Sequence, residues 1–130
     1  MDDSQKKELI QHRILKSKET IEEAKLSYQN KRYRLALNRV YYSIFYIVSA
    51  LSVKSNFSTS KHKQLMGWFT LNFVKTGIVS NKLYNIYKEA FDNRQESDYS
   101  DFIEYEVTNV LRLINEPEQF VLEIEKLILT

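Results

Sequence analysis

Glycine and proline are almost absent from this chain, and that scarcity limits the possible folds more than any other feature. Two glycines and one proline occur in 130 residues. An all-β sandwich or barrel needs many tight turns, which these residues usually supply, whereas long stretches rich in Leu, Ile, Lys, Glu and Tyr are typical of helices. The length is that of one ordinary domain. We therefore predict a single all-α domain over residues 1–130.

The absence of cysteine excludes several kinds of chemistry. Without cysteine, disulfides, cysteine-ligated zinc or iron–sulfur sites and thiol catalysis are ruled out. Residues 1–7 lack a basic segment followed by an apolar one, which is the pattern of a secretory signal. The apolar run from Val40 to Leu51 is shorter than the roughly 20 residues that cross a bilayer. We expect a cytoplasmic protein with no membrane contact, no metal and no cofactor.

Apolar residues recur at spacings of three and four along most of the chain, which is the period of an amphipathic helix. This pattern predicts four long helices and one shorter piece, which pack best as an up-and-down four-helix bundle with an additional short helix. The predicted segments run from 4 to 30, from 31 or 32 to 52, from about 61 to 76, from 80 to between 94 and 97, and from between 102 and 108 onward.

Individual residues mark the expected ends of these helices. Ser4 can cap the first helix, one of Ser58, Thr59 and Ser60 the third, and Ser80 the fourth. Gly77 can stop the third helix. Pro117 lacks a backbone N–H and crowds the carbonyl of Leu113, so we predict a kink or a restart of the last helix near 113–117.

The formal net charge of +2 conceals an uneven distribution along the chain. Residues 1–82 hold 15 Lys and Arg against 6 Asp and Glu, a charge of +9, whereas residues 83–130 hold 4 against 11, a charge of −7. We expect the acidic last helix to face basic helices, within the bundle or across a dimer. That arrangement leaves a local positive cleft near Arg39 and Arg94 and argues against indiscriminate coating of nucleic acid.

Polar residues interrupt the apolar pattern at two places, and each is a candidate for function. Asn38 and Arg39 precede the buried part of the second helix. At the end of the fourth helix lie Arg94, Glu96, Asp98 and Tyr99. A guanidinium beside carboxylates is often a plain ion pair, but repeated polar interruptions of a core indicate a site.

Four blocks of the sequence carry a family resemblance. The stretch from Arg32 to Tyr46 resembles the signature helix of HEPN domains. Lys61-His62, the block from Phe73 to Gly77, and the block from Arg94 to Phe102 are similar to later blocks of a small-protein branch of that family, the UPF0332 group. The match follows nearly the whole chain in order.

The resemblance implies an up-and-down helical bundle that dimerises, with the polar motifs of two subunits facing each other. It also implies functions centred on RNA or nucleotides, because the family includes metal-independent endoribonucleases, toxins of toxin–antitoxin pairs and partners of small nucleotidyltransferases. We therefore expect a homodimer that pairs with a minimal nucleotidyltransferase in a toxin–antitoxin-like system.

The catalytic members of the family use an arginine and a histidine with four to six residues between them. Arg94 matches the arginine, but Tyr99, Ser100 and Asp101 occupy the histidine positions. Tyr99 has an ordinary pKa of about 10 and Asp98 of about 3.9, so neither easily replaces an imidazole at neutral pH. An endoribonuclease toxin that uses Arg94 and Tyr99 is therefore the alternative hypothesis rather than the first.

The first hypothesis is binding of RNA or a nucleotide. Its predicted site comprises Asn38, Arg39, Tyr42, Arg94 and Asp98, where the arginines hold phosphate and Tyr41, Tyr42 or Tyr99 stacks on a base. A purely structural adaptor, in which both arginines only fix helix ends through Glu96, Asp98 or Asp101, is a further alternative. His62 is expected to be an exposed residue in the first turn of the third helix, and could carry protons only if folding or dimerisation brought it near Arg94.

Overall fold

The computed structural model describes the backbone of residues 1–99 and 106–130, and the side chains of residues 1–94 and 106–130. Within these ranges the chain forms helices and no strand. The elements are α1 (Asp3–Gln29), α2 (Tyr33–Lys54), α3 (His62–Phe69), a π-helical turn η1 (Thr70–Val74), α4 (Asn81–Tyr99) and α5 (Val107–Leu129). The predicted bundle of four long helices with one short helix is confirmed.

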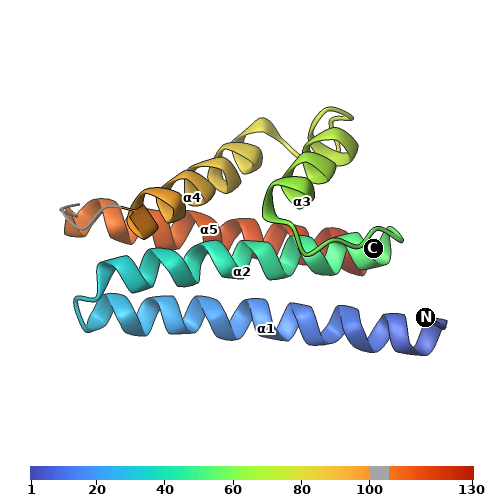
Figure 1. The fold of residues 1–130 in the computed structure, drawn as a ribbon, viewed down its shortest axis with the longest axis horizontal. Coiled ribbons are helices and arrows are strands. Elements are labelled where there is room, and N and C mark those ends of the chain that lie inside the picture. The colour runs from blue at the N-terminus through green and yellow to red at the C-terminus, as the bar shows by residue number, and fades with distance from the viewer. Residues whose placement is uncertain (100–105) are drawn as a thin grey trace.

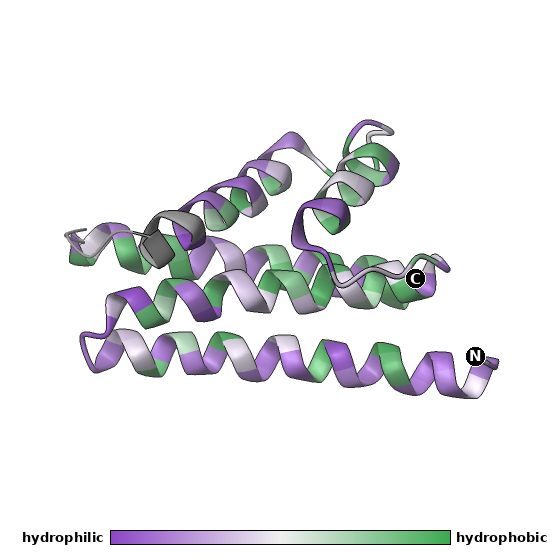
Figure 2. Ribbon diagram, viewed as in Figure 1, coloured by the Kyte–Doolittle hydropathy of each residue, from purple (hydrophilic) through white to green (hydrophobic). Residues whose placement is uncertain are grey.

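Helix α2 lies at the centre of the bundle and packs against α1, α3, α4 and α5. Figure 1 shows α1 and α2 side by side in opposite directions, α5 alongside α2, and α3 and α4 covering the face of α2 away from α1. Helix α2 carries the longest hydrophobic stretch, whereas α1 is mostly hydrophilic (Figure 2). This arrangement covers α2 on several sides, as its many apolar residues require.

Small residues let α1 and α2 approach closely. Ala24 of α1 and Ala36 of α2 are fully buried. The Ser17 hydroxyl donates to the backbone oxygen of Ser43 at 2.6 Å, so a buried polar group is satisfied across the two helices. The other side of the core is aromatic, where Phe69, Tyr87 and Phe120 bring α3, α4 and α5 into contact.

The helix ends agree with the predictions only in part. Asp2, not Ser4, caps α1: its carboxylate accepts from the N–H of Gln5, whose side chain accepts from the N–H of Asp2. Asn30 ends α1 as expected. Helix α2 continues to Lys54, two residues beyond the predicted end. The capping box of Asp2 and Gln5 is more favourable than a cap by Ser4 alone, because it satisfies two backbone N–H groups at once.

The ends of the later helices also agree with the predictions only in part. Lys61 is the N-cap of α3 and provides no side-chain cap, so the predicted serine or threonine cap is wrong. Gly77 adopts a left-handed φ of 82° soon after η1, as a helix stop requires. Ser80 accepts from the N–H of Leu83 at the start of α4. Helix α4 extends past the predicted end to Tyr99.

The predicted restart at Pro117 is wrong. Helix α5 runs from Val107 to Leu129 with Pro117 inside it. The proline ring is buried, and together with Leu37, Val40 and Ile86 it lines a small enclosed space between α2, α4 and α5. Packing of the apolar face of α5 against α2 outweighs the loss of one backbone hydrogen bond at the proline.

The predicted contact between the acidic last helix and a basic helix is confirmed within the bundle. Lys18 of α1 lies 2.7 Å from Glu125 of α5, and Lys25 of α1 bonds to Glu118 of α5. The hydrogen bond to Glu118 is the main reason that the pKa of Lys25 is raised above its ordinary value. Part of the positive charge of α1 is therefore neutralised by α5.

Candidate functional site

Arg94 reaches from the last turns of α4 to two neighbouring tyrosines of α2. Its guanidinium carbon lies 5.3 Å from the ring centre of Tyr41 and 5.5 Å from that of Tyr42. Its Nη2 also donates to the hydroxyl oxygen of Tyr42 at 3.3 Å. Cation–π contacts of this kind favour a cation over an aromatic face, so the rings of α2 hold the arginine in place.

Arg39 of α2 also contacts the ring of Tyr42. Its guanidinium carbon is 5.2 Å from the ring centre of Tyr42. The Nε and Nη2 groups donate to the side-chain oxygen of Asn38 at 3.2 and 2.8 Å, and Nη1 lies 3.7 Å from a carboxylate oxygen of Glu23. Two guanidinium groups from different helices thus contact one partly exposed tyrosine ring.

His62, the first residue of α3, joins these tyrosines. Its ring stacks on Phe45 at a centroid distance of 4.4 Å and on Tyr41 at 5.4 Å, and it meets Tyr42 edge-on at 5.6 Å. Its Nδ1 lies 2.6 Å from the hydroxyl oxygen of Tyr41. The predicted exposed position is wrong: His62 lies in the first turn of the third helix, as expected, but is half-buried because that turn packs onto α2.

The charges of this cluster follow from burial. Burial lowers the pKa of His62, and the positive charge of Arg94 lowers it further. Burial raises the pKa of Tyr41 well above its ordinary value, although Arg94 opposes that shift. At neutral pH the arginines are therefore the only cations among these side chains, while the imidazole of His62 is neutral and the phenol of Tyr41 keeps its proton. We call Asn38, Arg39, Tyr41, Tyr42, His62 and Arg94 the polar cluster.

A basic groove lies between α3 and η1 on one side and α4 on the other. It has a volume of about 580 Å³. Three lysines line it, and with the side chains that the structure describes only Lys88 bonds to a carboxylate, that of Asp92. The groove adjoins the polar cluster, because the ring of Phe91 borders both the groove and Tyr41. Its full lining is Lys63, Met66, Gly67, Thr70, Leu71, Lys75, Tyr84, Lys88, Phe91 and Asp92.

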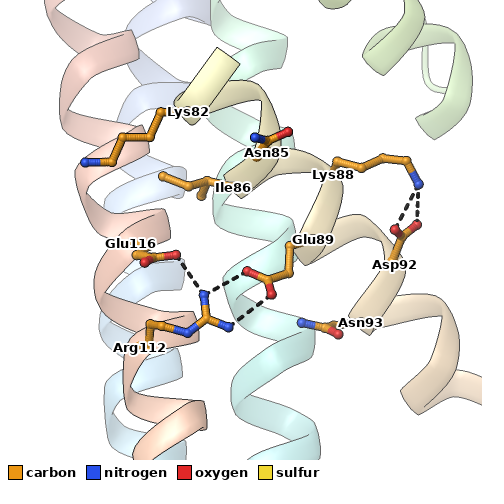
Figure 3. A pocket seen from close by; sticks show the side chains of 9 residues that line it. All are labelled: Lys82, Asn85, Ile86, Lys88, Glu89, Asp92, Asn93, Arg112 and Glu116. Carbon is orange, nitrogen blue, oxygen red and sulfur yellow. Dashed lines mark hydrogen bonds and ion pairs between the residues drawn. The ribbon is translucent and has the colours of Figure 1, made fainter. Parts of the chain in front are cut away.

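A larger groove of about 770 Å³ lies between α4 and α5. Figure 3 shows that charged side chains pair with one another across it. Arg112 of α5 contacts Glu89 of α4 and Glu116 of α5, each at 3.0 Å. These charges neutralise each other, so the larger groove offers no net attraction for an anion.

The described residues show neither a metal cluster nor a membrane-spanning helix. In the ranges 1–94 and 106–130, where side chains are described, no three His, Asp or Glu residues gather as metal ligands. No helix in the same part of the chain is long and apolar enough to cross a membrane.

The family model that matches this chain is the HEPN domain, over residues 10–127. The chain belongs to the HEPN domain family. The match and the observed helical bundle confirm the family that the sequence blocks of this HEPN protein indicated.

Curated relatives match this HEPN protein along nearly its whole length. It is 38% identical over 125 residues to a "UPF0332 protein" of Thermotoga maritima, covering 96% of this chain and 95% of that protein. It is 32% identical over 120 residues to "Putative toxin MJ0605" of Methanocaldococcus jannaschii, covering 92% and 89%. It is 28% identical over 117 residues to "Putative toxin MJ0142" of the same organism, covering 90% and 80%. The name of the Thermotoga maritima relative agrees with the predicted UPF0332 branch.

The structure brings most of the predicted binding residues of this HEPN protein together. The guanidinium groups of Arg39 and Arg94 both contact the ring of Tyr42, and the side-chain oxygen of Asn38 accepts a hydrogen bond from Arg39. The predicted Asp98 and Tyr99 belong to α4, but their side chains lie outside the described residues, as does that of Glu96. Among the described residues, the carboxylate next to Arg39 is that of Glu23 of α1, which is not one of the predicted partners.

Sequence reasoning missed the placement of two residues in the cluster. Tyr41 was only one of three tyrosines considered for stacking, yet it contacts both Arg94 and His62. The sequence predicts an exposed His62, because nothing in the local sequence shows that the start of α3 lies against the middle of α2. The only signal was Lys61-His62, a block in the family resemblance.

Proposed function

We propose that this HEPN protein is a toxin-like module that binds RNA or a nucleotide at the polar cluster. The observation that carries the proposal is that two guanidinium groups, those of Arg39 and Arg94, contact the partly exposed ring of Tyr42. Guanidinium groups recognise phosphate oxygens, and tyrosine rings stack on bases. One small site therefore combines the two interactions that a nucleotide needs.

The basic groove supports RNA as the larger ligand. Lys63 and Lys75 line it without a carboxylate partner among the described residues. Phosphates along a single strand gain affinity from such lysines, mainly through release of counterions. A strand bound with one nucleotide at Tyr42 can continue into the groove, because Lys63 of the groove directly follows His62 of the cluster in the chain.

Binding at the polar cluster can be measured by fluorescence anisotropy with a labelled single-stranded RNA and with labelled adenine nucleotides. Arg39→Gln and Arg94→Gln should each weaken binding by about tenfold or more, which corresponds to the loss of one charge-assisted contact of ~1.4 kcal/mol or more. Lys7→Gln is the matched control, since Lys7 is exposed on α1, which packs only against α2 and α5 among the described elements. Equal binding by all variants would refute this site.

We also propose that the protein acts as a homodimer and pairs with a minimal nucleotidyltransferase. The support is membership in the HEPN family together with the toxin names of two relatives. Light scattering of the purified protein measures the oligomeric state, and a single molecular mass equal to one chain would contradict the dimer. Co-expression with the nucleotidyltransferase encoded nearest to it tests the pairing, which fails if the two proteins elute separately.

If the role of the arginines is purely structural, we expect different results from the same variants. In that case Arg39→Ala and Arg94→Ala would lower stability or change the oligomeric state, while neither protein nor variant would bind RNA or nucleotide at low salt. Thermal unfolding followed by circular dichroism, run beside the anisotropy measurement, separates this alternative from ligand binding.

A further inference from the structure

Helices α1 and α2 meet along a row of side-chain pairs that keeps one constant register. The two helices run side by side in opposite directions (Figure 1). Steps of seven and then three residues along α1 match the same steps along α2, and such steps keep side chains on one face of each helix. The pairs in contact are Glu23 with Arg39, Lys16 with Tyr46, and Arg13 with Ser49. We call these six residues the seam, and it begins at the polar cluster, because Arg39 belongs to both.

The cations that α1 contributes here contact neutral groups. Nζ of Lys16 lies 5.2 Å from the centre of its partner ring, and Nη1 of Arg13 donates to its partner hydroxyl at 2.8 Å. One step of seven residues further, Nζ of Lys6 donates to the side-chain oxygen of Asn56 at 2.8 Å. Within residues 1–94 and 106–130, none of these three cations contacts a carboxylate. Their positive charge is therefore not neutralised by a direct ion pair.

The side of α1 that meets α5 is different. Lys18 and Lys25 lie there, and they pair with Glu125 and Glu118. On the seam, burial lowers the pKa of Arg13 below its ordinary value, because a half-buried guanidinium without a counter-charge is unfavourable. A bound anion offsets that cost. The contrast between the two sides of α1 indicates an anion site on the seam.

Tyr46 places a second aromatic ring beside the one in the polar cluster. It lies one helical turn beyond Tyr42 on α2, and the two ring centres are 6.1 Å apart. Both rings are partly exposed. Successive bases of a single strand stack on such neighbouring rings, whereas the bases of a duplex are paired with one another. The seam thus offers a ring for a base and cations for phosphates.

We propose that the seam is a second nucleotide subsite, which makes the protein prefer single-stranded RNA of two or more nucleotides to a mononucleotide. This inference rests on the binding function proposed for the polar cluster and adds the minimum length of the ligand. The base next to the one at Tyr42 stacks on Tyr46, and Lys16 and Arg13 hold the phosphates that follow it. Glu23 offsets the charge of Arg39 at the junction, so attraction for phosphate is stronger beyond it.

The seam and the basic groove belong to different helices. The seam lies between α1 and α2, whereas the groove is lined by α3, η1 and α4. Each contributes to a different part of one strand, since the polar cluster contains residues of α2, α3 and α4. The contribution of the seam can therefore be measured without changing the lysines of the groove.

The first test compares the full-length protein's affinity for labelled uridine mononucleotide and tetranucleotide by fluorescence anisotropy. Wild type should bind the tetranucleotide about tenfold more tightly or better. Tyr46→Leu should lower this affinity ratio by about fivefold or more, because it removes the ring. Tyr46→Phe should restore the ratio, since it keeps the ring and the Tyr46 hydroxyl has no hydrogen-bond partner among the described residues. A merely structural need for bulk at this position would not distinguish leucine from phenylalanine.

The second test removes the charge and not the ring. Arg13→Gln with Lys16→Gln should weaken tetranucleotide binding and flatten the slope of log affinity against log salt by about 0.7 for each phosphate that is no longer neutralised. Lys7→Gln is the matched control and should leave the slope unchanged. It lies about three helical turns before Lys18, so it shares the face of α1 that meets α5. This double variant carries the test if Tyr46→Leu does not fold, which circular dichroism shows.

The possible outcomes separate this inference from the proposed function. If the ring and charge variants bind the tetranucleotide as wild type does while Arg94→Gln does not, the second subsite is refuted and the polar cluster stands. An equal loss of mononucleotide and tetranucleotide binding in Tyr46→Leu traces the loss to Tyr42 and also refutes it. Variants that change the molecular mass in light scattering but not the RNA affinity identify the seam as a contact between copies of the chain, which overturns the inference. If wild type binds neither ligand, both proposals fail.

Discussion

The hydroxyl of Tyr41 and Nδ1 of His62 lie 2.6 Å apart and join the middle of α2 to the first turn of α3. Tyr41 is fully buried, so this bond satisfies a polar group that water cannot reach. It also sets the position of α3, which has no side-chain cap of its own. The bond therefore serves the fold and the candidate site at once, and the two roles can be measured separately.

Removal of the hydroxyl should affect the free energy of unfolding differently at two buried tyrosines. Tyr41→Phe breaks the bond to His62 and should lower the free energy of unfolding by about 1 kcal/mol or more. Tyr87 is equally buried, but its hydroxyl has no hydrogen-bond partner among the described residues. Tyr87→Phe should therefore leave stability unchanged or raise it by up to ~1–2 kcal/mol. Urea denaturation of both variants measures the difference, and equal losses would contradict it.

The pKa of His62 should be lower in the folded protein than in the unfolded chain. Burial is the larger cause and Arg94 the second. Tyr41 and Tyr42 of α2 face the ring without charge, and in the chain His62 is flanked by Lys61, the N-cap of α3, and by Lys63. The neutral imidazole then contributes stability that is fully present above about pH 6.5, the unfolded value. That stability is lost as the pH falls through the lower folded-state pKa.

NMR titration of the imidazole checks this shift. A background of His12→Asn leaves His62 as the one histidine in the spectrum. Arg94→Gln should raise the pKa of His62 but leave it below about 6.5, because burial remains. A pKa of His62 that does not move in Arg94→Gln would show that the two side chains are too far apart in solution to interact.

The aromatic contact among α3, α4 and α5 should account for much of the stability on that side of the bundle. Phe69 is fully buried and contacts the rings of Phe73, Tyr87 and Phe120. Phe69→Ala should lower the free energy of unfolding by about 3–5 kcal/mol. Leu71→Ala is the control, since Leu71 is 60% exposed and its truncation should change stability by less than ~0.5 kcal/mol. Chemical denaturation of both proteins measures the contrast.

The lysines of the basic groove should contribute to RNA affinity through their charge. A double variant, Lys63→Gln with Lys75→Gln, should weaken binding of single-stranded RNA and flatten the slope of log affinity against log salt by about 0.7 for each phosphate that is no longer neutralised. Binding of a mononucleotide, which reaches only the polar cluster, should not change. Anisotropy titrations across a salt series give both results. An unchanged slope would exclude the groove from the RNA path.

The helices could be predicted from sequence because their causes are local. Scarce glycine and proline, apolar residues at spacings of three and four, and the stops at Asn30 and Gly77 depend on neighbours along the chain. The predicted restart at Pro117 was wrong, because the effect of a proline on a helix depends on the residues that pack around it. Its ring is buried beside α2 and α4, so α5 continues through a residue that would end an isolated helix.

The sequence by itself determined the helical class and the family, and it predicted Asn38, Arg39 and Arg94 as candidate site residues. Only the tertiary structure decided that Arg39 and Arg94 lie on one tyrosine ring and that His62 joins them. The physical reason is that these side chains come from three helices. Their meeting depends on how α3 and α4 pack across α2, and that packing results from burial of distant apolar surfaces, which no local pattern records.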